Sequence, residues 1–127
     1  MTPIEIRKAQ NQILEHVAEA GSLSDAASVL VKFVYRLSPD SYFESMKSAA
    51  SEWLLRPKGW IALYFSRGRS GFDPKIIVSI DLWPQNVPAG LDQLKIRQGR
   101  KPQWSKFTIG NVRQMKDALA LVEYTSP

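Results

Sequence analysis

The chain lacks cysteine altogether and has a single histidine among its 127 residues. Without thiols it can form no disulfide, no thiolate metal site and no cysteine nucleophile. The histidine, His16, stands next to Glu15, and a metal site there would need further carboxylates from elsewhere in the fold. We therefore expect no metal, no cofactor and no catalytic residues, with His16 an ordinary helix histidine.

Long hydrophobic runs are also missing. No stretch reaches the about eighteen apolar residues of a membrane span, because Lys32 and Arg36 interrupt the longest candidate. The charged N-terminus does not have the pattern of a signal peptide. The sequence thus predicts a protein of the cytoplasm, nucleoid or nucleus that is not secreted and does not cross a membrane.

Hydrophobic residues make up 44% of the chain, enough for one compact domain. In residues 1–55, apolar positions spaced by three and four predict three helices. The first begins at Pro3 with Thr2 as its cap and stops at Gly21, and the second runs from a cap at Ser22 or Ser24 to Ser38-Pro39. The third would have its buried side formed by Phe43, Met46, Ala50, Trp53 and Leu54.

After residues 56–59 the hydrophobic period changes to two, which is typical of strands. The expected strands are residues 60–66, 75–83, 92–97 and 104–109, followed by a helix that starts at Gly110-Asn111. The predicted fold is α+β. A segment of three N-terminal helices (1–55) precedes a basic module (56–127) with a four-stranded antiparallel sheet and a C-terminal helix.

Alternation assigns the two faces of these strands. Ile76, Val78, Ile80 and Leu82 should face the core, as should Phe107 and Ile109. In the last helix the expected apolar stripe is Val112, Met115, Leu119 and Val122, which leaves Leu121 and Tyr124 off it. A second copy of the chain could bury those two, so a homodimer through the C-terminal helix is expected.

Charge divides the chain unevenly. Residues 1–55 hold five Lys/Arg and seven Asp/Glu, whereas residues 56–127 hold twelve Lys/Arg and five Asp/Glu. A concentrated positive surface is typical of proteins that bind polyanions. The C-terminal part is therefore the candidate nucleic-acid-binding region.

Catalytic patterns are weak by comparison. Gly68 and Gly71 lack the third glycine and the following helix of a dinucleotide site. Asp73 and Asp81 could approach Lys75 in a hairpin, loosely like a nuclease metal site, but turn chemistry explains an aspartate before Pro74. We do not expect an enzyme.

The candidate nucleic-acid-binding residues combine outward-facing strand positions with two basic turns. Tyr64 and Trp83 share the outward parity, although Trp83 and Trp104 could equally be covered by the N-terminal helices. Cations would contact phosphates and exposed rings would stack on unpaired bases. The predicted site is Arg67, Arg69, Lys95, Arg97, Arg100, Lys101, Trp104 and Lys106.

The segment 75–83, the turn Gln98-Gly99-Arg100-Lys101 and the helix opening at Asn111 together resemble the positive-cofactor-four family of single-stranded-DNA-binding transcriptional coactivators. The resemblance covers about residues 60–124. It departs at Pro102-Gln103, where the family has a glycine, and at the N-terminal helices. It implies a dimer whose strands form grooves for single strands, with Lys95, Arg97, Arg100, Lys101 and Lys106 in contact with them.

The leading hypothesis is thus a non-enzymatic protein that binds single-stranded DNA or RNA and has a role in transcription regulation or replication. The alternative is a small interaction module, such as a phage or mobile-element inhibitor of a host protein. That module would use its helical segment to bind a protein partner.

Overall fold

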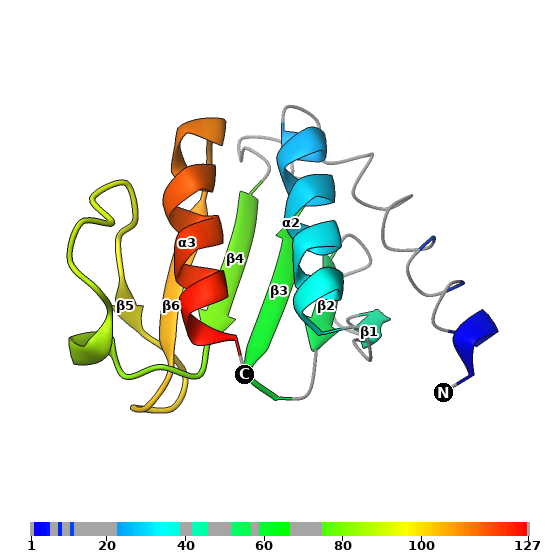
Figure 1. Cartoon of the computed structure of the whole chain (residues 1–127), viewed down its shortest axis with the longest axis horizontal. Helices are drawn as coiled ribbons and strands as arrows, with labels where there is room; N and C mark the ends of the chain where they lie inside the picture. The colour runs from blue at the N-terminus through cyan, green and yellow to red at the C-terminus, as the bar shows by residue number, and fades with distance from the viewer. Residues whose placement is uncertain are drawn as a thin grey trace.

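A six-stranded antiparallel sheet with two helices on one face forms the described fold (Figure 1). The computed structural model describes residues 2–5, 8, 11, 23–38, 42–45, 52–56, 59–66 and 75–126. The strand order is β1-β2-β3-β4-β6-β5. The α+β class and the antiparallel sheet are confirmed.

Helix α2 (Ser24–Leu37) agrees closely with the second predicted helix. Its buried residues recur at helical spacing and pack into the core together with Leu23. The chain leaves the helix at Ser38, whose N–H donates to the Val34 carbonyl at 2.8 Å. The predicted serine cap is wrong, because the N-cap is Leu23 and no side chain caps this end. The buried residues of α2 are Ala26, Ala27, Leu30, Val31, Val34 and Tyr35.

The third predicted helix is wrong in the part of it that the structure describes. Strands β1 (Tyr42–Ser45) and β2 (Glu52–Arg56) pair antiparallel, with Tyr42 opposite Arg56, and β2 pairs in turn with β3. The helical pattern had joined apolar residues from two short strands into one stripe. Pairing with an existing sheet overrides such local periodicity. The two predicted segments, 1–55 and 56–127, therefore both contribute strands to one sheet.

Of the first predicted helix, the structure describes only its beginning and single later positions. Residues 3–5, 8 and 11 are helical, and the Glu5 N–H donates to the Thr2 hydroxyl at 3.2 Å. The cap at Thr2 and the helical start at Pro3 are confirmed. The rest of this helix, His16 included, lies outside the described residues.

The central strands are β3 (Ile61–Ser66), β4 (Lys75–Ile80) and β6 (Ser105–Ile109). Val78 pairs with Leu63 on one side and Phe107 on the other, and all three are fully buried. The predicted core face of β4 and β6 is confirmed for Ile76, Val78, Ile80, Phe107 and Ile109.

Two strands are shorter than predicted. Strand β4 ends at Ile80, because the Leu82 N–H turns back to the Ile80 carbonyl and the 3₁₀ turn η2 (Pro84–Asn86) follows. Strand β5 contains only Arg97–Gln98. Residues 92–96 do not join the ladder, because the backbone of Gln93 is bonded to side chains of the C-terminal helix instead.

The C-terminal helix starts with the 3₁₀ turn η3 (Val112–Gln114) and continues as α3 (Met115–Thr125). The predicted start at Asn111 is confirmed by a capping box with Gln114. The predicted stripe is wrong at Val112, which is 63% exposed, because the tighter 3₁₀ turn rotates it off the α-helical face.

The buried face of α3 consists instead of Ala118, Leu121 and Val122, with Met115 and Leu119 packed at its sides. Leu121 is fully buried in the core of its own chain, so it is not available to a second copy. Tyr124 remains exposed. The homodimer through this helix stays a prediction. Of the two residues that suggested it, only Tyr124 is exposed.

Two polar atoms in the core find no hydrogen-bond partner among the described residues. They are the Tyr35 hydroxyl on α2 and the Trp60 indole N–H just before β3. Burial removes the Tyr35 phenol from water and raises its pKa from 10.0 to about 12. The folded state therefore holds the Tyr35 proton more tightly than the unfolded state does.

We expect Tyr35→Phe to raise the free energy of unfolding near neutral pH by about 1 kcal/mol, because a buried hydroxyl without a partner is destabilising. In the wild type, the stability due to Tyr35 protonation is complete below pH 10 and is lost as the pH rises toward 12. Urea unfolding at several pH values tests both points, with the exposed Tyr124→Phe as control. A less stable Tyr35→Phe would show that the hydroxyl has a partner.

Candidate functional site

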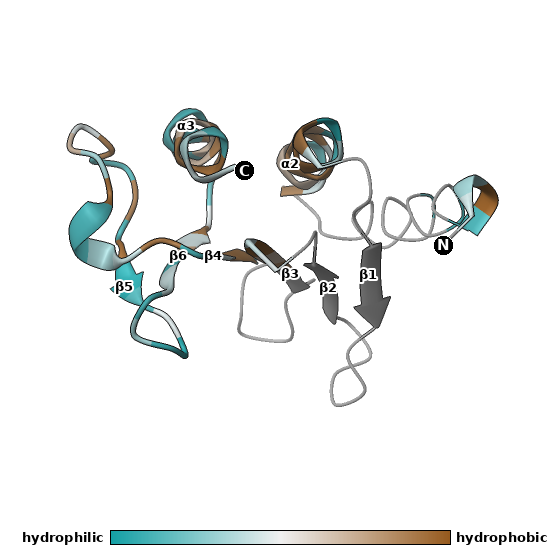
Figure 2. Ribbon diagram, turned by 60° about the horizontal axis from the view of Figure 1, so that its bottom comes forward, coloured by the Kyte–Doolittle hydropathy of each residue, from teal (hydrophilic) through white to brown (hydrophobic). Residues whose placement is uncertain are grey.

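One face of the sheet is covered by α2 and α3, and no described helix lies on the other (Figure 2). The side chains on that second face form two rows across the strands. One row, from β3 to β5, is Ala62, Ser79, Lys106 and Arg97, and the other is Tyr64, Ile77 and Thr108. All except the exposed Arg97 are half-buried. We call this surface the open face.

Two cations stand directly opposite one another on the open face. Arg97 of β5 is the register partner of Lys106 of β6. Arg97 Nη2 donates to the Thr108 hydroxyl at 2.9 Å, so the guanidinium reaches along the sheet toward Thr108. Like charges at directly opposed positions of a sheet repel. No described carboxylate forms an ion pair with either residue, so this repulsion is not relieved within the described part of the chain.

A shallow hollow of about 430 Å³ lies beside this pair and is lined by Lys95, Arg97, Thr108 and Gln114. Lys95 is exposed and would face Thr108 if the register of β5 and β6 were continued. Strong hydrogen-bond donors and positive charge therefore converge on one depression. Such an arrangement suits an anion with several oxygens, such as a phosphate.

Gln114 fixes the wall of this hollow through its side-chain amide. Its Oε1 accepts from the Gly110 and Asn111 N–H groups at 2.7 and 3.3 Å. Its Nε2 donates to the Thr108 and Gln93 carbonyls at 3.0 and 3.1 Å. The segment before Lys95 is thereby attached both to the end of β6 and to the start of the C-terminal helix. Because both ends of the amide are engaged, Gln114 positions the site rather than binding a ligand itself.

Asp117 of α3 completes this attachment, since its Oδ2 accepts from the Gln93 N–H at 3.0 Å. Both backbone groups of Gln93 are thus held by side chains of the C-terminal helix. Lys95 follows two residues later and Arg97 begins β5. The cations therefore extend from a fixed backbone, and a fixed backbone loses less entropy in any binding event than a free one does.

The turn between β5 and β6 adds the exposed Arg100 and Lys101. It is closed by hydrogen bonds from the Gly99 N–H to the Trp104 carbonyl at 2.7 Å and from the Trp104 N–H to the Lys101 carbonyl at 3.0 Å. A Cβ at Gly99 would lie 2.9 Å from the Trp104 Cβ, so this position needs glycine. Trp104 itself is half-buried and is not part of the core cluster.

Six of the eight predicted site residues are described: five cations, and Trp104, which is half-buried in the turn. The structure brings Lys95, Arg97 and Lys106 together on the open face, with Arg100 and Lys101 in the adjoining turn. Arg67 and Arg69 lie outside the described residues. We name the five described cations of strands β5 and β6 and their connections the basic hairpin: Lys95, Arg97, Arg100, Lys101 and Lys106.

Sequence reasoning did not include Lys75 or Gln114 in the site. Lys75 begins β4, is exposed, and shares the parity of Ile77 on the open face. The same alternation that placed Ile77 outward could have identified it. Gln114 stands three residues after Asn111, which is the spacing of a capping box. Its role in the helix cap could therefore be predicted from the sequence, but its bond to Gln93 could not.

The sequence left open whether Trp83 is exposed or covered by the N-terminal helices. The structure shows Trp83 exposed, at 45%, at the start of η2. The loose nuclease arrangement gains no support from the described residues. Lys75 and Asp81 lie at opposite ends of β4, and Asp73 is outside the described part of the chain. The described residues contain no group of three His, Asp or Glu side chains suited to a metal ion.

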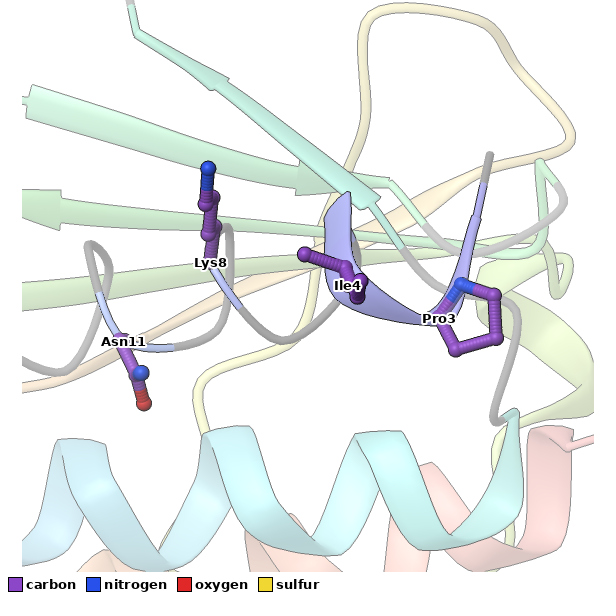
Figure 3. Close-up of a pocket in the computed structure, with 4 residues that line it drawn as sticks. All are labelled: Pro3, Ile4, Lys8 and Asn11. Carbon is purple, nitrogen blue, oxygen red and sulfur yellow. The ribbon is translucent and has the colours of Figure 1, made fainter.

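A second hollow, of about 420 Å³, is lined by Pro3, Ile4, Lys8 and Asn11 of the N-terminal segment. In Figure 3 Lys8 and Asn11 point away from one another, so the hollow does not bring polar groups together. None of the helices that the structure describes has the length and apolarity to cross a membrane.

Replacing Gln114 with Ala should lower the free energy of unfolding by about 1–3 kcal/mol, since it removes the Gln114 half of the capping box and the bonds to Gln93 and Thr108. Gln93→Ala is the matched control, because only the backbone of Gln93 takes part in these bonds. Thermal and urea unfolding measure the difference. Equal stability of the two variants would contradict the positioning role.

Comparisons of the chain with protein-family models, with curated proteins and with solved structures found no match. The resemblance to the single-stranded-DNA-binding coactivators therefore stays a prediction from short motifs, and the site must be interpreted from its own chemistry.

Proposed function

We propose that this protein is a non-enzymatic nucleic-acid-binding protein whose basic hairpin holds the sugar-phosphate backbone of single-stranded DNA or RNA. The single observation that carries the proposal is the opposed pair Arg97 and Lys106, two cations without a described acidic partner, beside the hollow that Lys95 also lines. An anion between these side chains would attract both, and that attraction would outweigh their mutual repulsion.

The shape of the surface favours a single strand over a duplex. The cations lie on a sheet and its hairpin turn, and helices α2 and α3 are on the opposite face of that sheet (Figure 2). Reading a duplex commonly requires a helix or ribbon inserted into a groove, whereas sheet surfaces serve as platforms for unpaired strands. A role in transcription regulation or replication would follow from that preference.

The proposal predicts that binding of a labelled single-stranded oligonucleotide weakens steeply with salt, with a log–log slope of about −0.7 for each phosphate neutralised. Charge reversal in Arg97→Glu/Lys106→Glu should lower the affinity at least about tenfold and make the slope less steep by about 1.4. Fluorescence anisotropy at several salt concentrations measures both quantities.

Lys32→Glu/Lys116→Glu is the matched control, because both lysines are exposed on the helical layer and the change in net charge is identical. Equal losses in the two double variants would mean that only net charge matters and would contradict a site at the basic hairpin. Absence of binding at low salt would exclude the function itself.

A further inference from the structure

The open face continues beyond the cations into a surface of different chemistry. Thr108 of β6 is paired with Ile77 of β4, and Ile77 with Tyr64 of β3. One row across the sheet therefore leads from the Arg97 guanidinium, which donates to Thr108, to an aliphatic and then an aromatic side chain. Tyr64 lies two strand spacings from Thr108, about 10 Å.

Tyr64 and Ile77 stand beside smaller neighbours. In the adjacent row of the same face, Ala62 occupies β3 and Ser79 occupies β4, and the two are register partners. Both are short side chains, so the ring of Tyr64 is not enclosed by bulky groups on that side. The ring and Ile77 are half-buried although no described helix covers this face.

From this arrangement we infer that Tyr64, with Ile77 beside it, is the platform on which an unpaired base of the bound strand stacks. This inference rests on the proposed function, because the basic hairpin would hold the phosphates at one side of the open face while the bases extend toward β3. A base offers a flat apolar surface to a ring, and its attached phosphate is attracted to the neighbouring cations. In a duplex the faces of the bases are already stacked, so Tyr64 would make the protein select single strands.

Trp104 is less suited to this role than Tyr64. It precedes β6 and is held in the hairpin turn by both of its backbone groups, close against Gly99. It also lies outside the row that Thr108 and Ile77 form. The structure therefore shifts the expected stacking residue from the turn to the centre of the sheet.

The test compares two single strands of equal length and charge, an oligothymidylate and an abasic strand with the same phosphates and sugars but no bases. The wild type should bind the oligothymidylate at least about fivefold more tightly than the abasic strand. Tyr64→Phe, which keeps the ring, should preserve that ratio. Tyr64→Leu, which keeps apolar bulk without a ring, should reduce the ratio to near one and leave binding of the abasic strand unchanged.

Tyr124→Leu is the control, since Tyr124 is exposed on α3 in the opposite layer. Circular dichroism of each variant at the titration temperature establishes that it is folded, and Tyr64→Phe tests the role of the ring with the least disturbance of the sheet. Equal binding of the two strands by the wild type would overturn the stacking inference and leave the phosphate-binding function intact. Failure to bind either strand would overturn the proposed function and the inference with it.

Discussion

The pairing of β4 with β6 decides which side chains of this protein are enclosed and which are presented to a ligand. It sets Val78 against Phe107 in the core and, one residue along, Ser79 against Lys106 on the open face. A slip of one residue would bring Lys106 into the apolar interior and turn Phe107 to solvent. The free energy of burying the core is thus also what holds the cations at their positions.

The pair of cations on the open face lowers the stability of the fold that positions it. Arg97 and Lys106 are opposed without a described counter-charge, which costs stability in the free protein. The bonds of Gln114 and Asp117 to Gln93 hold the adjoining segment in place beside this pair. Helix α3 therefore serves two purposes, since its inner face covers the sheet and its first turns position the neighbouring loop.

Local patterns predicted those parts of the fold that local interactions determine. The bounds of α2, the faces of β4 and β6 and the cap at Asn111 follow from periodicity and from hydrogen bonds between close neighbours. The segment around residues 42–56 was misjudged because β1 pairs with β2 and β2 with β3, and the spacing of apolar residues along one segment does not show which segments pair as strands. Val112 was misplaced because a 3₁₀ turn has a different period from the helix that follows it.

The candidate site divides in the same way. The outward positions of Arg97 and Lys106 follow from alternation, but their direct opposition depends on the register between strands. The bonds from Gln114 and Asp117 to Gln93 span more than twenty residues and could not be read from spacing. The shortness of β5 has the same cause, because the backbone of Gln93 is engaged by a helix rather than by a strand.

That shortness has a consequence for how copies of the protein meet. Strand β5 is the last strand on its side of the sheet and offers only two residues of ladder. A long, uncharged edge would invite another chain to add a strand, and repeated addition leads to aggregation. Here few backbone groups are free for such pairing, and the arginine and lysines around them repel the same edge of another copy. At this edge of the sheet, the charges that would attract a polyanion thus also disfavour the addition of a strand from another copy.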